Sequence, residues 1–208
     1  MMDENDAFAA CPLVAILRGL APPEAEDIGA ALVGAGFRLI EVPLNSPRPL
    51  DSIERLARRF GDQAVIGAGT VLDPAEVDAL AEAGGRLVVA PNFDPAVAAA
   101  AARRGMAYAP GIATPSEAFA ALQAGAAMLK LFPAEMIPPA AVKAMRAVLP
   151  GAARLVPVGG ITPDAMAPYR AAGADGFGLG SALYRPGMGA ADVARNAAAF
   201  MAALPAAG

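Results

Sequence analysis

Only two lysines occur in the chain, and Lys130 stands inside an apolar run where a charged side chain needs an explanation. The run Ala-Met-Leu-Lys-Leu-Phe-Pro (127–133) otherwise has the composition of a buried strand. An ammonium among apolar side chains loses hydration, which lowers its pKa toward the range where a neutral amine attacks a carbonyl carbon. This setting predicts a Schiff-base nucleophile. The alternative is a structural lysine at the end of the strand, whose amine reaches water.

Glu41 is a second ionisable residue in an apolar strand-like run, Leu-Ile-Glu-Val-Pro-Leu (39–44). Burial disfavours the carboxylate and raises its pKa into the range that suits general acid–base catalysis. A buried glutamate on its own is also a common ion-pair partner of Arg or Lys. A lysine and a glutamate on separate strands of one barrel instead favour catalysis.

Composition excludes several other chemistries. The chain has no histidine and one cysteine, Cys11, so metal sites built from His or Cys, His-dependent triads and disulfides are excluded. The net charge of −4 and pI near 4.9 argue against nucleic-acid binding. No apolar run reaches the roughly 18 residues of a membrane span, and the acidic start lacks the basic region of a signal peptide. We therefore expect a soluble cytoplasmic protein with no membrane partner.

Prolines and glycines divide the chain at regular intervals, as strand-plus-helix units require. Prolines roughly 20 to 27 residues apart precede helix-like segments at Pro22, Pro47, Pro74, Pro95, Pro115, Pro138, Pro163 and Pro186. Four of them follow cap-forming residues, Asp73, Asp94, Thr114 and Thr162. The helix-like stretches end at Gly36, Gly84, Gly105, Gly125, Gly151 and Gly173.

Eight short apolar runs lie between these signals and predict buried parallel strands: 13–17, 39–44, 65–71, 87–90, 106–110, 128–132, 155–158 and 176–179. Eight strands alternating with helices predict an α/β fold, a (β/α)8 TIM barrel, formed by residues 1–208 as a single domain. The alternative is a doubly wound open sheet, but the first predicted strand is followed by no Gly-x-Gly-x-x-Gly turn. Residues 1–10 are expected to be a solvated tail or a short helix that caps the barrel.

In such a barrel, functional side chains gather at the C-terminal ends of the strands. The polar residues follow this rule. Arg18 closes the first predicted strand, Asn45 follows the second, Thr70 ends the third and Asn92 follows the fourth.

Two glycine-rich segments follow the seventh and eighth predicted strands, Gly159-Gly160 and Gly178-Leu-Gly-Ser181. Backbone N–H groups in such loops, with a helix N-terminus and a serine hydroxyl, form a phosphate cradle. Most Gly-Gly pairs are only turns. Their place after these two strands, where barrels often hold a phosphate, favours the cradle.

These residues lie in seven longer segments that together carry a resemblance to a known protein family. The segments are 15–19 (Ala-Ile-Leu-Arg-Gly), 41–46 (Glu-Val-Pro-Leu-Asn-Ser), 66–71 (Ile-Gly-Ala-Gly-Thr-Val), 90–92 (Ala-Pro-Asn), 129–133 (Leu-Lys-Leu-Phe-Pro), 158–161 (Val-Gly-Gly-Ile) and 178–181 (Gly-Leu-Gly-Ser). Over nearly its whole length the chain resembles the 2-keto-3-deoxy-6-phosphogluconate/4-hydroxy-2-oxoglutarate aldolase family. The resemblance implies a class I aldolase, a lyase that works as a homotrimer of (β/α)8 barrels and needs no metal or organic cofactor.

The resemblance also implies a role for each matching residue. These are Lys130 as the Schiff-base lysine, Glu41 as general acid/base, Arg18 and Thr70 around the substrate carboxylate, Phe132 and Pro91 as pocket wall, and Gly159, Gly160, Gly180 and Ser181 as phosphate loops. In the mechanism that this implies, Lys130 attacks C2 of a phosphorylated keto-deoxy sugar acid. The iminium then accepts the electrons of the C3–C4 bond, which yields glyceraldehyde 3-phosphate and pyruvate.

Two substrate-binding positions depart from the gluconate-type members of the family. Asn45 stands where those members typically carry arginine, and Val158 where they commonly carry threonine. Both departures favour galactonate-type specificity, with the gluconate type as the alternative. A phosphosugar-binding barrel without covalent catalysis, or an isomerase that uses Glu41 as base, also stays open; both would leave Lys130 idle.

Overall fold

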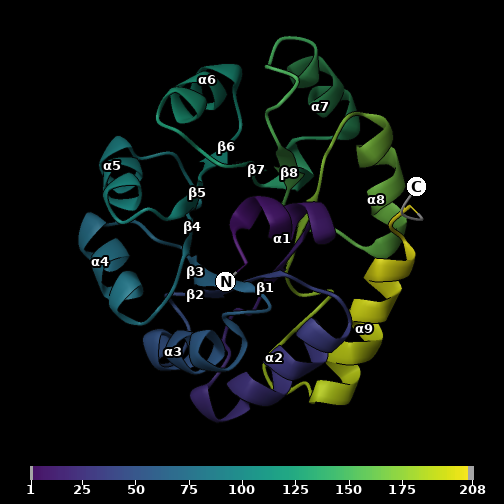
Figure 1. Cartoon of the computed structure of the whole chain (residues 1–208). Helices are drawn as coiled ribbons and strands as arrows, with labels where there is room; N and C mark the ends of the chain where they lie inside the picture. The colour runs from purple at the N-terminus through teal and green to yellow at the C-terminus, as the bar shows by residue number, and fades with distance from the viewer. Residues whose placement is uncertain (1, 206–208) are drawn as a thin grey trace.

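The structure is a computed structural model, and it describes residues 2–205. The strands gather at the centre and the helices α2 to α9 surround them, with α1 lying over the middle of the ring (Figure 1). The strands are β1 (Leu13–Ile16), β2 (Leu39–Pro43), β3 (Val65–Gly69), β4 (Leu87–Val89), β5 (Ala107–Ala109), β6 (Gly111–Ile112), β7 (Leu129–Leu131), β8 (Leu155–Pro157) and β9 (Phe177–Leu179). The α-helices are α1 (Glu4–Ala10), α2 (Ala25–Gly34), α3 (Pro49–Phe60), α4 (Pro74–Glu82), α5 (Pro95–Arg103), α6 (Pro115–Gln123), α7 (Pro139–Arg146), α8 (Pro163–Ala171) and α9 (Ala190–Ala202), with 3-10 helices η1 (Pro22–Glu24) and η2 (Ala134–Met136).

All the strand pairs are parallel, which confirms the predicted α/β class. A curled six-stranded sheet has the order β5-β4-β3-β2-β1-β9, and a three-stranded sheet has the order β6-β7-β8. The last strand, β9, therefore pairs with the first strand, β1. In a doubly wound sheet, the alternative considered from the sequence, the strand order instead reverses next to the first strand. Backbone contacts also run between the two sheets: Val158 bridges Gly178, and the Lys130 N–H donates to the Pro110 carbonyl at 2.9 Å.

The prediction of eight strands needs one correction. The fifth strand was predicted over 106–110; the structure has β5 within this run and an additional short strand, β6, directly after Pro110. Proline has no N–H to contribute to a ladder, so the pairing changes partners at this residue. β5 pairs with β4, and β6 pairs with β7.

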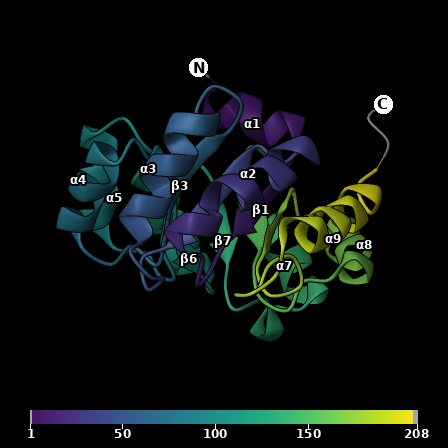
Figure 2. The same ribbon diagram turned by 90° about the horizontal axis from the view of Figure 1, so that it is seen from below.

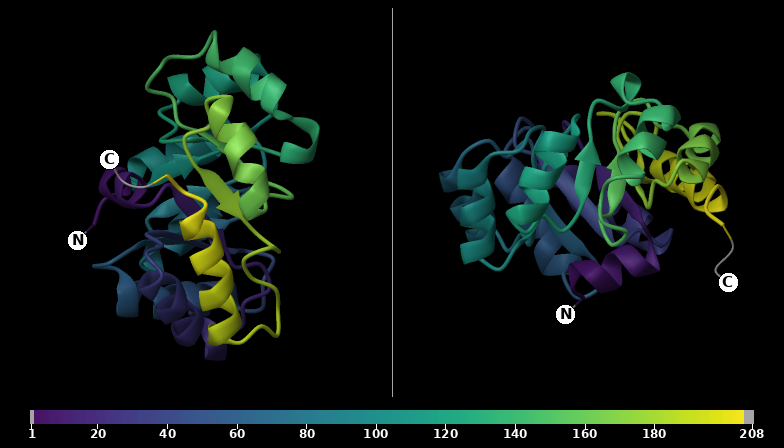
Figure 3. Two further views of the ribbon diagram at one scale, coloured as in Figure 1. Left: turned by 90° about the vertical axis from the view of Figure 1, so that its right-hand side faces the viewer. Right: turned by 90° about the horizontal axis from the view of Figure 1, so that it is seen from above.

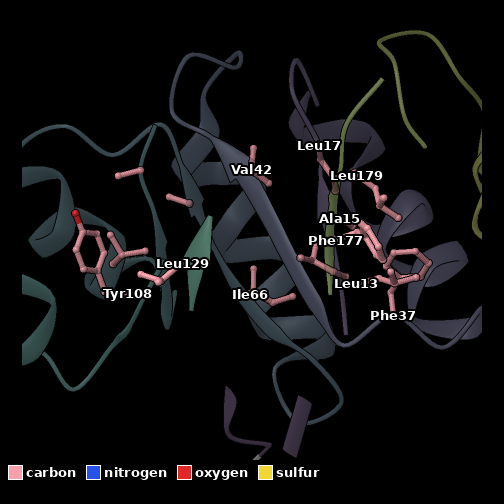
Figure 4. Close-up of a cluster of buried hydrophobic side chains, with 14 of the residues drawn as sticks. Leu13, Ala15, Leu17, Phe37, Val42, Ile66, Tyr108, Leu129, Phe177 and Leu179 are labelled. Carbon is pink, nitrogen blue, oxygen red and sulfur yellow. The ribbon is translucent and has the colours of Figure 1, made fainter. Parts of the chain in front are cut away.

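The strands separate two apolar layers. Alternate side chains, such as Val14, Leu39 and Met128, point inward and form one buried cluster. The others pack against the surrounding helices, as Leu13 and Phe177 do (Figure 4). Glu41 and Lys130 each lie two residues beyond an inward-facing neighbour, Leu39 and Met128, so the period of two places both on the inner face.

Helix starts were predicted correctly at the four prolines that follow Asp73, Asp94, Thr114 and Thr162. Asp73 and Thr114 form capping boxes with Glu76 and Glu117 at α4 and α6. The start predicted at Pro47 is wrong, because α3 begins at Pro49. The intervening Arg48 precedes a proline and therefore avoids the helical region; its φ is +43°.

Two further helix starts also lie later than predicted. α7 begins at Pro139, with Pro138 as its N-cap, and α9 begins at Ala190 rather than at Pro186. Gly187, with φ of +86°, turns the chain after Pro186 and prevents a helix from beginning there. In the described part of the chain, no helix combines the length and the apolar character that a membrane crossing requires.

Helix α1 (Glu4–Ala10) lies against one end of the strands, in the part of the chain expected to be either a solvated tail or a short capping helix. All views place α1 at one end of the strands (Figures 2 and 3). Phe8 is buried in the inner cluster, and the Arg154 guanidinium carbon lies 4.7 Å from the centre of its ring. Gly176 makes room for this ring, because a Cβ there would lie 2.9 Å from it. The C-terminal ends of the strands, where the predicted site residues lie, are therefore at the opposite end.

We expect Phe8→Ala to lower the free energy of unfolding by about 3 kcal/mol, since it removes a buried aromatic ring and leaves a cavity. Urea titration of wild type and variant measures the difference. Asn5→Ala, at an exposed position of the same helix, is the matched control and should change little. Equal stability of Phe8→Ala and wild type would mean that α1 does not pack on this end of the strands in solution.

Candidate active site

Lys130 lies at the middle of β7, between its ladder partners Gly111 and Val156. Its side chain is only 7% exposed. Burial lowers the pKa of Lys130; the carboxylate of Glu41 opposes this shift, and the positive charge of Arg18 adds to it. The Nζ atom lies 4.6 Å from the centre of the Phe132 ring. Residues 2–205 offer Nζ no ion pair within 4.0 Å and no side-chain hydrogen bond.

Glu41 is still more deeply buried, at 1% exposure, in the middle of β2. Burial raises its pKa to about 7, although the positive charges of Lys130 and Arg18 both act to lower it. Its Oε2 atom is buried and has no hydrogen-bond partner among residues 2–205. The carboxyl group can therefore take up or release a proton near neutral pH.

The space for the Glu41 carboxyl group comes from the neighbouring strand. A Cβ atom on Gly69 of β3 would lie 1.9 Å from Glu41 Oε2, so no larger residue fits there without moving the carboxyl group. The next residue, Thr70, has φ of +57°, which is a strained conformation for a β-branched side chain. Gly69 did not stand out in the sequence, where it is one of two glycines in the segment 66–71.

Lys130 joins two spaces at the C-terminal ends of the strands. Below lies a small apolar hollow of about 10 Å³, which Lys130 shares with Glu41, Met128 and Val158. Above lies an open cleft of about 640 Å³. Eight predicted site residues line the cleft, namely Arg18, Lys130, Phe132, Val158, Gly159, Gly160, Gly180 and Ser181.

Besides Glu41, which lies in the hollow, three predicted residues lie outside the cleft lining. Asn45 lies beside it, where its Oδ1 accepts a hydrogen bond from Arg18 Nη1 at 2.7 Å. Thr70 and Pro91 follow β3 and β4 on the side of Glu41. The Pro91 backbone packs against Gly111, because a Cβ on that glycine would lie 2.1 Å from the Pro91 carbonyl oxygen.

The far wall of the cleft offers unpaired donors. The N–H groups of Gly160, Gly180 and Ser181 donate to no acceptor within residues 2–205. Thr162 is the N-cap of α8, yet its side chain accepts no capping hydrogen bond. Backbone donors beside a helix N-terminus favour an anion.

Sequence reasoning did not select two residues of this wall, Thr162 and Arg185. Thr162 had been interpreted only as a helix cap. Arg185 follows the 178–181 loop by four residues, and in the described part of the chain it forms no ion pair. A positively charged residue just after a glycine-rich loop was the sequence signal that could have identified Arg185.

A protein-family comparison identifies the chain. The family model described as KDPG and KHG aldolase matches residues 5–198. The chain belongs to this aldolase family. Its members are carbon–carbon lyases, and the chain is therefore an enzyme of that class.

Individual relatives agree with the family. The "probable 2-dehydro-3-deoxy-6-phosphogalactonate aldolase" of Rhizobium meliloti is 52% identical over 92% of this chain and 91% of its own length. The 2-dehydro-3-deoxy-6-phosphogalactonate aldolase of Escherichia coli is 48% identical over 92% of this chain and 94% of its own. A solved structure described as native KDPGal has a TM-score of 0.91 at 48% identity, and covers 92% of this chain and 93% of that one.

Two further solved structures bear on chemistry and assembly. The KDPG aldolase of Legionella pneumophila, solved with pyruvate captured as a covalent carbinolamine intermediate, has a TM-score of 0.79 at 26% identity; the match covers 97% of this chain and 96% of that one. A protein cage designed by fusing symmetric oligomeric domains matches with a TM-score of 0.91 at 48% identity, and covers 93% of this chain and 72% of that one.

We expect Glu41→Gln to change the pH dependence of stability. The pKa of Glu41 is about 7 in the folded protein and 4.5 in its unperturbed state, so the folded chain holds a proton that the unfolded chain releases between these values. This contribution is complete below pH 4.5 and is lost as pH rises through 7. Between pH 5 and 8.5 the variant should therefore gain on the order of 3 kcal/mol of unfolding free energy relative to wild type.

Urea titrations at several pH values measure this difference. The unsatisfied Gln amide would lower stability by a similar amount at every pH, so only the slope is diagnostic. Glu54→Gln, at an exposed position of α3, is the control. Parallel curves for Glu41→Gln and wild type would contradict the raised pKa.

Proposed function

We propose that the chain is a class I aldolase that cleaves 2-dehydro-3-deoxy-6-phosphogalactonate to pyruvate and D-glyceraldehyde 3-phosphate. One observation carries the proposal: an amine and a carboxyl group, both buried and without an ion-pair partner in the described part of the chain, share one hollow at the base of the cleft. The amine is an available nucleophile because burial lowers its pKa. The carboxyl group, with a pKa of about 7, can give and take protons during a single cycle.

In the proposed cycle, the neutral amine of Lys130 attacks C2 of the keto acid and forms a carbinolamine. Glu41 protonates the departing hydroxyl, water leaves, and an iminium remains. The electron pair of the C3–C4 bond moves into this iminium as the C4 hydroxyl gives its proton to the Glu41 carboxylate, which releases the aldehyde. The Glu41 carboxyl group then protonates the enamine at C3, and hydrolysis of the resulting iminium frees pyruvate and Lys130. Because the iminium accepts the electrons, the cycle needs neither metal nor organic cofactor.

The captured carbinolamine of the Legionella relative supports this first step, since it is the adduct that a lysine and pyruvate form before water leaves. An isomerase or a binding protein that uses Glu41 without covalent chemistry would leave Lys130 without a role. A lysine buried in a hollow with no ion-pair partner is costly, so an idle Lys130 is the poorer explanation.

The two charged ends of the substrate fit opposite walls of the cleft. Arg18, with Thr70 beyond the cleft edge, is assigned to the carboxylate; Phe132 and Pro91 form the apolar wall. The glycine loops at 159–160 and 180–181 are assigned to the phosphate, because their N–H groups at 160, 180 and 181 are unpaired. Arg185 adds a positive charge to the same wall.

The galactonate assignment rests on two supports. Both curated relatives reported above carry the phosphogalactonate name. Val158, which lines the cleft beside Lys130, offers the substrate no hydrogen bond. The phosphogluconate compound, its C4 epimer, is the alternative substrate.

We also propose that the two sheets form one closed (β/α)8 barrel, a single domain over residues 1–208. The bridge from Val158 to Gly178 and the hydrogen bond from Lys130 to Pro110 support closure. A homotrimer is proposed from the family resemblance, and the designed cage built from symmetric oligomeric domains supports self-association. The cytoplasmic location expected from the sequence stays a prediction.

Borohydride reduction in the presence of pyruvate tests the covalent step. We expect one adduct, on Lys130, identified by peptide mass mapping. Lys143, exposed on α7, is the internal control because it is the other lysine of the chain. An adduct on Lys143 alone, or none, would overturn the mechanism. Lys130→Met should abolish cleavage and keep the fold, since a similarly sized apolar side chain suits the hollow.

The choice of epimer can be tested at Val158. Replacing it by threonine keeps the shape and adds a hydroxyl that can hydrogen-bond one orientation of the C4 hydroxyl. The ratio of kcat/KM for the two epimers should then shift toward phosphogluconate by about 1–3 kcal/mol. A wild type that strongly prefers phosphogluconate, or an unchanged ratio in Val158→Thr, would remove Val158 from the account of specificity.

A further inference from the structure

Two hydrogen bonds tie the loop after β1 to the loop after β2. Arg18 Nη1 donates to Asn45 Oδ1 at 2.7 Å, and the next residue, Gly19, donates its N–H to Ser46 Oγ at 2.9 Å. Both continue the pairing of the two strands, which ends with Leu17 N–H donating to the Glu41 carbonyl at 2.9 Å. The position of Arg18 is therefore fixed relative to the strand that carries Glu41.

The third side of this loop is closed by the segment after β9. Gly19 has φ of +83°, and a Cβ there would lie 2.6 Å from the Pro186 side chain. The backbone below Arg18 thus has little freedom. The Arg18 side chain itself is exposed, and the contact with Asn45 is its one hydrogen bond within residues 2–205.

The hydrogen bond to Asn45 holds the Arg18 guanidinium in place without neutralising its positive charge. Asn45 is a neutral amide, and within the described residues Arg18 has no carboxylate within 4.0 Å. A guanidinium has five N–H donors, so one bond to Asn45 leaves donors for bidentate contact with a carboxylate. A mobile arginine would lose side-chain entropy on binding, whereas a held arginine has already lost part of it.

We infer that Asn45 is a positioning residue, which acts on the keto acid through Arg18 and not by touching the substrate. Ser46 anchors the backbone of the same loop through Gly19. This inference rests on the proposed function, in which Arg18 receives the substrate carboxylate. It assigns the predicted substrate-binding residue Asn45 a different task from direct contact.

The charge of Arg18 reaches both central groups of the hollow. It lowers the pKa of Lys130 and also that of Glu41. A displaced Arg18 would therefore allow the pKa of Lys130 to rise, and a larger share of the amine would be protonated at neutral pH. Asn45 should in this way influence nucleophile activation as well as binding, although it lies beside the cleft.

A double-mutant cycle tests the inference with pyruvate, which lacks a phosphate, and borohydride trapping at Lys130. Asn45→Ala in the wild type should raise the half-saturating pyruvate concentration about 3- to 10-fold, the reach of one lost hydrogen bond. In an Arg18→Ala background the same substitution should change it less than about 2-fold. In an Arg185→Ala background, the matched control in the same cleft, the full effect should remain.

Two more readouts separate positioning from a merely structural role. Asn45→Asp keeps a hydrogen-bond acceptor for Arg18, but the new carboxylate neutralises the positive charge of the guanidinium. This variant should therefore weaken pyruvate binding more than Asn45→Ala does. The pH at which the trapping rate is half-maximal should rise in Asn45→Ala and in Arg18→Ala, with no further rise in the double variant.

Each outcome decides between the hypotheses. An Asn45→Ala effect of equal size with and without Arg18 would show that Asn45 acts on the substrate or on the fold, and would overturn the inference alone. No effect of Asn45→Ala in the wild type would also overturn it. Absence of any wild-type pyruvate adduct would overturn the proposed function, and the inference with it.

Discussion

The desolvation of two opposite charges in one apolar interior is the constraint on which the rest of the site depends. Glu41 and Lys130 lie on the inner face of the strand ring, where their neighbours are aliphatic. No contact within 4.0 Å joins them as an ion pair. Burial therefore dominates both pKa shifts and moves them toward each other, upward for the carboxyl group and downward for the amine. A close ion pair would have stabilised both charges and removed the reactive neutral amine.

Much of the fold could be predicted because its signals are local. A cap residue followed by proline marks the start of a helix, as Asp73-Pro74 and Thr114-Pro115 do, because the cap satisfies an N–H and the proline fixes φ. The failures occurred where this local chemistry was incomplete. Ser46 precedes Pro47, but its hydroxyl accepts the Gly19 N–H instead of capping a helix, and a second proline follows at Pro49. Pro186 is followed by a glycine that turns the chain. The change of pairing partner at Pro110 depends on which neighbouring strand would accept a ladder hydrogen bond from this position, and that information is not local.

The same distinction explains the site. Lys130 and Glu41 could be found from sequence because a charged residue in an apolar strand conflicts with its surroundings. Gly69 could not, because its role is to leave room: a Cβ there would lie 1.9 Å from Glu41 Oε2, an atom of another strand. The bond between Arg18 and Asn45 likewise joins residues 27 positions apart and follows from strand register. Sequence identified the two groups that are proposed to react; the groups that give them room and position required the structure.

Helix α1 at one end of the ring has a consequence for the order of events under the proposed function. With Phe8 and its neighbours filling that end, the cleft at the other end is the way in and the way out. After the carbon–carbon bond breaks, the three-carbon enamine is still bonded to Lys130 at the base of the cleft, and the aldehyde lies above it toward solvent. The aldehyde therefore departs first and pyruvate second. In the synthetic direction, pyruvate must enter before the aldehyde, so the shape of the molecule imposes an ordered sequence of binding and release.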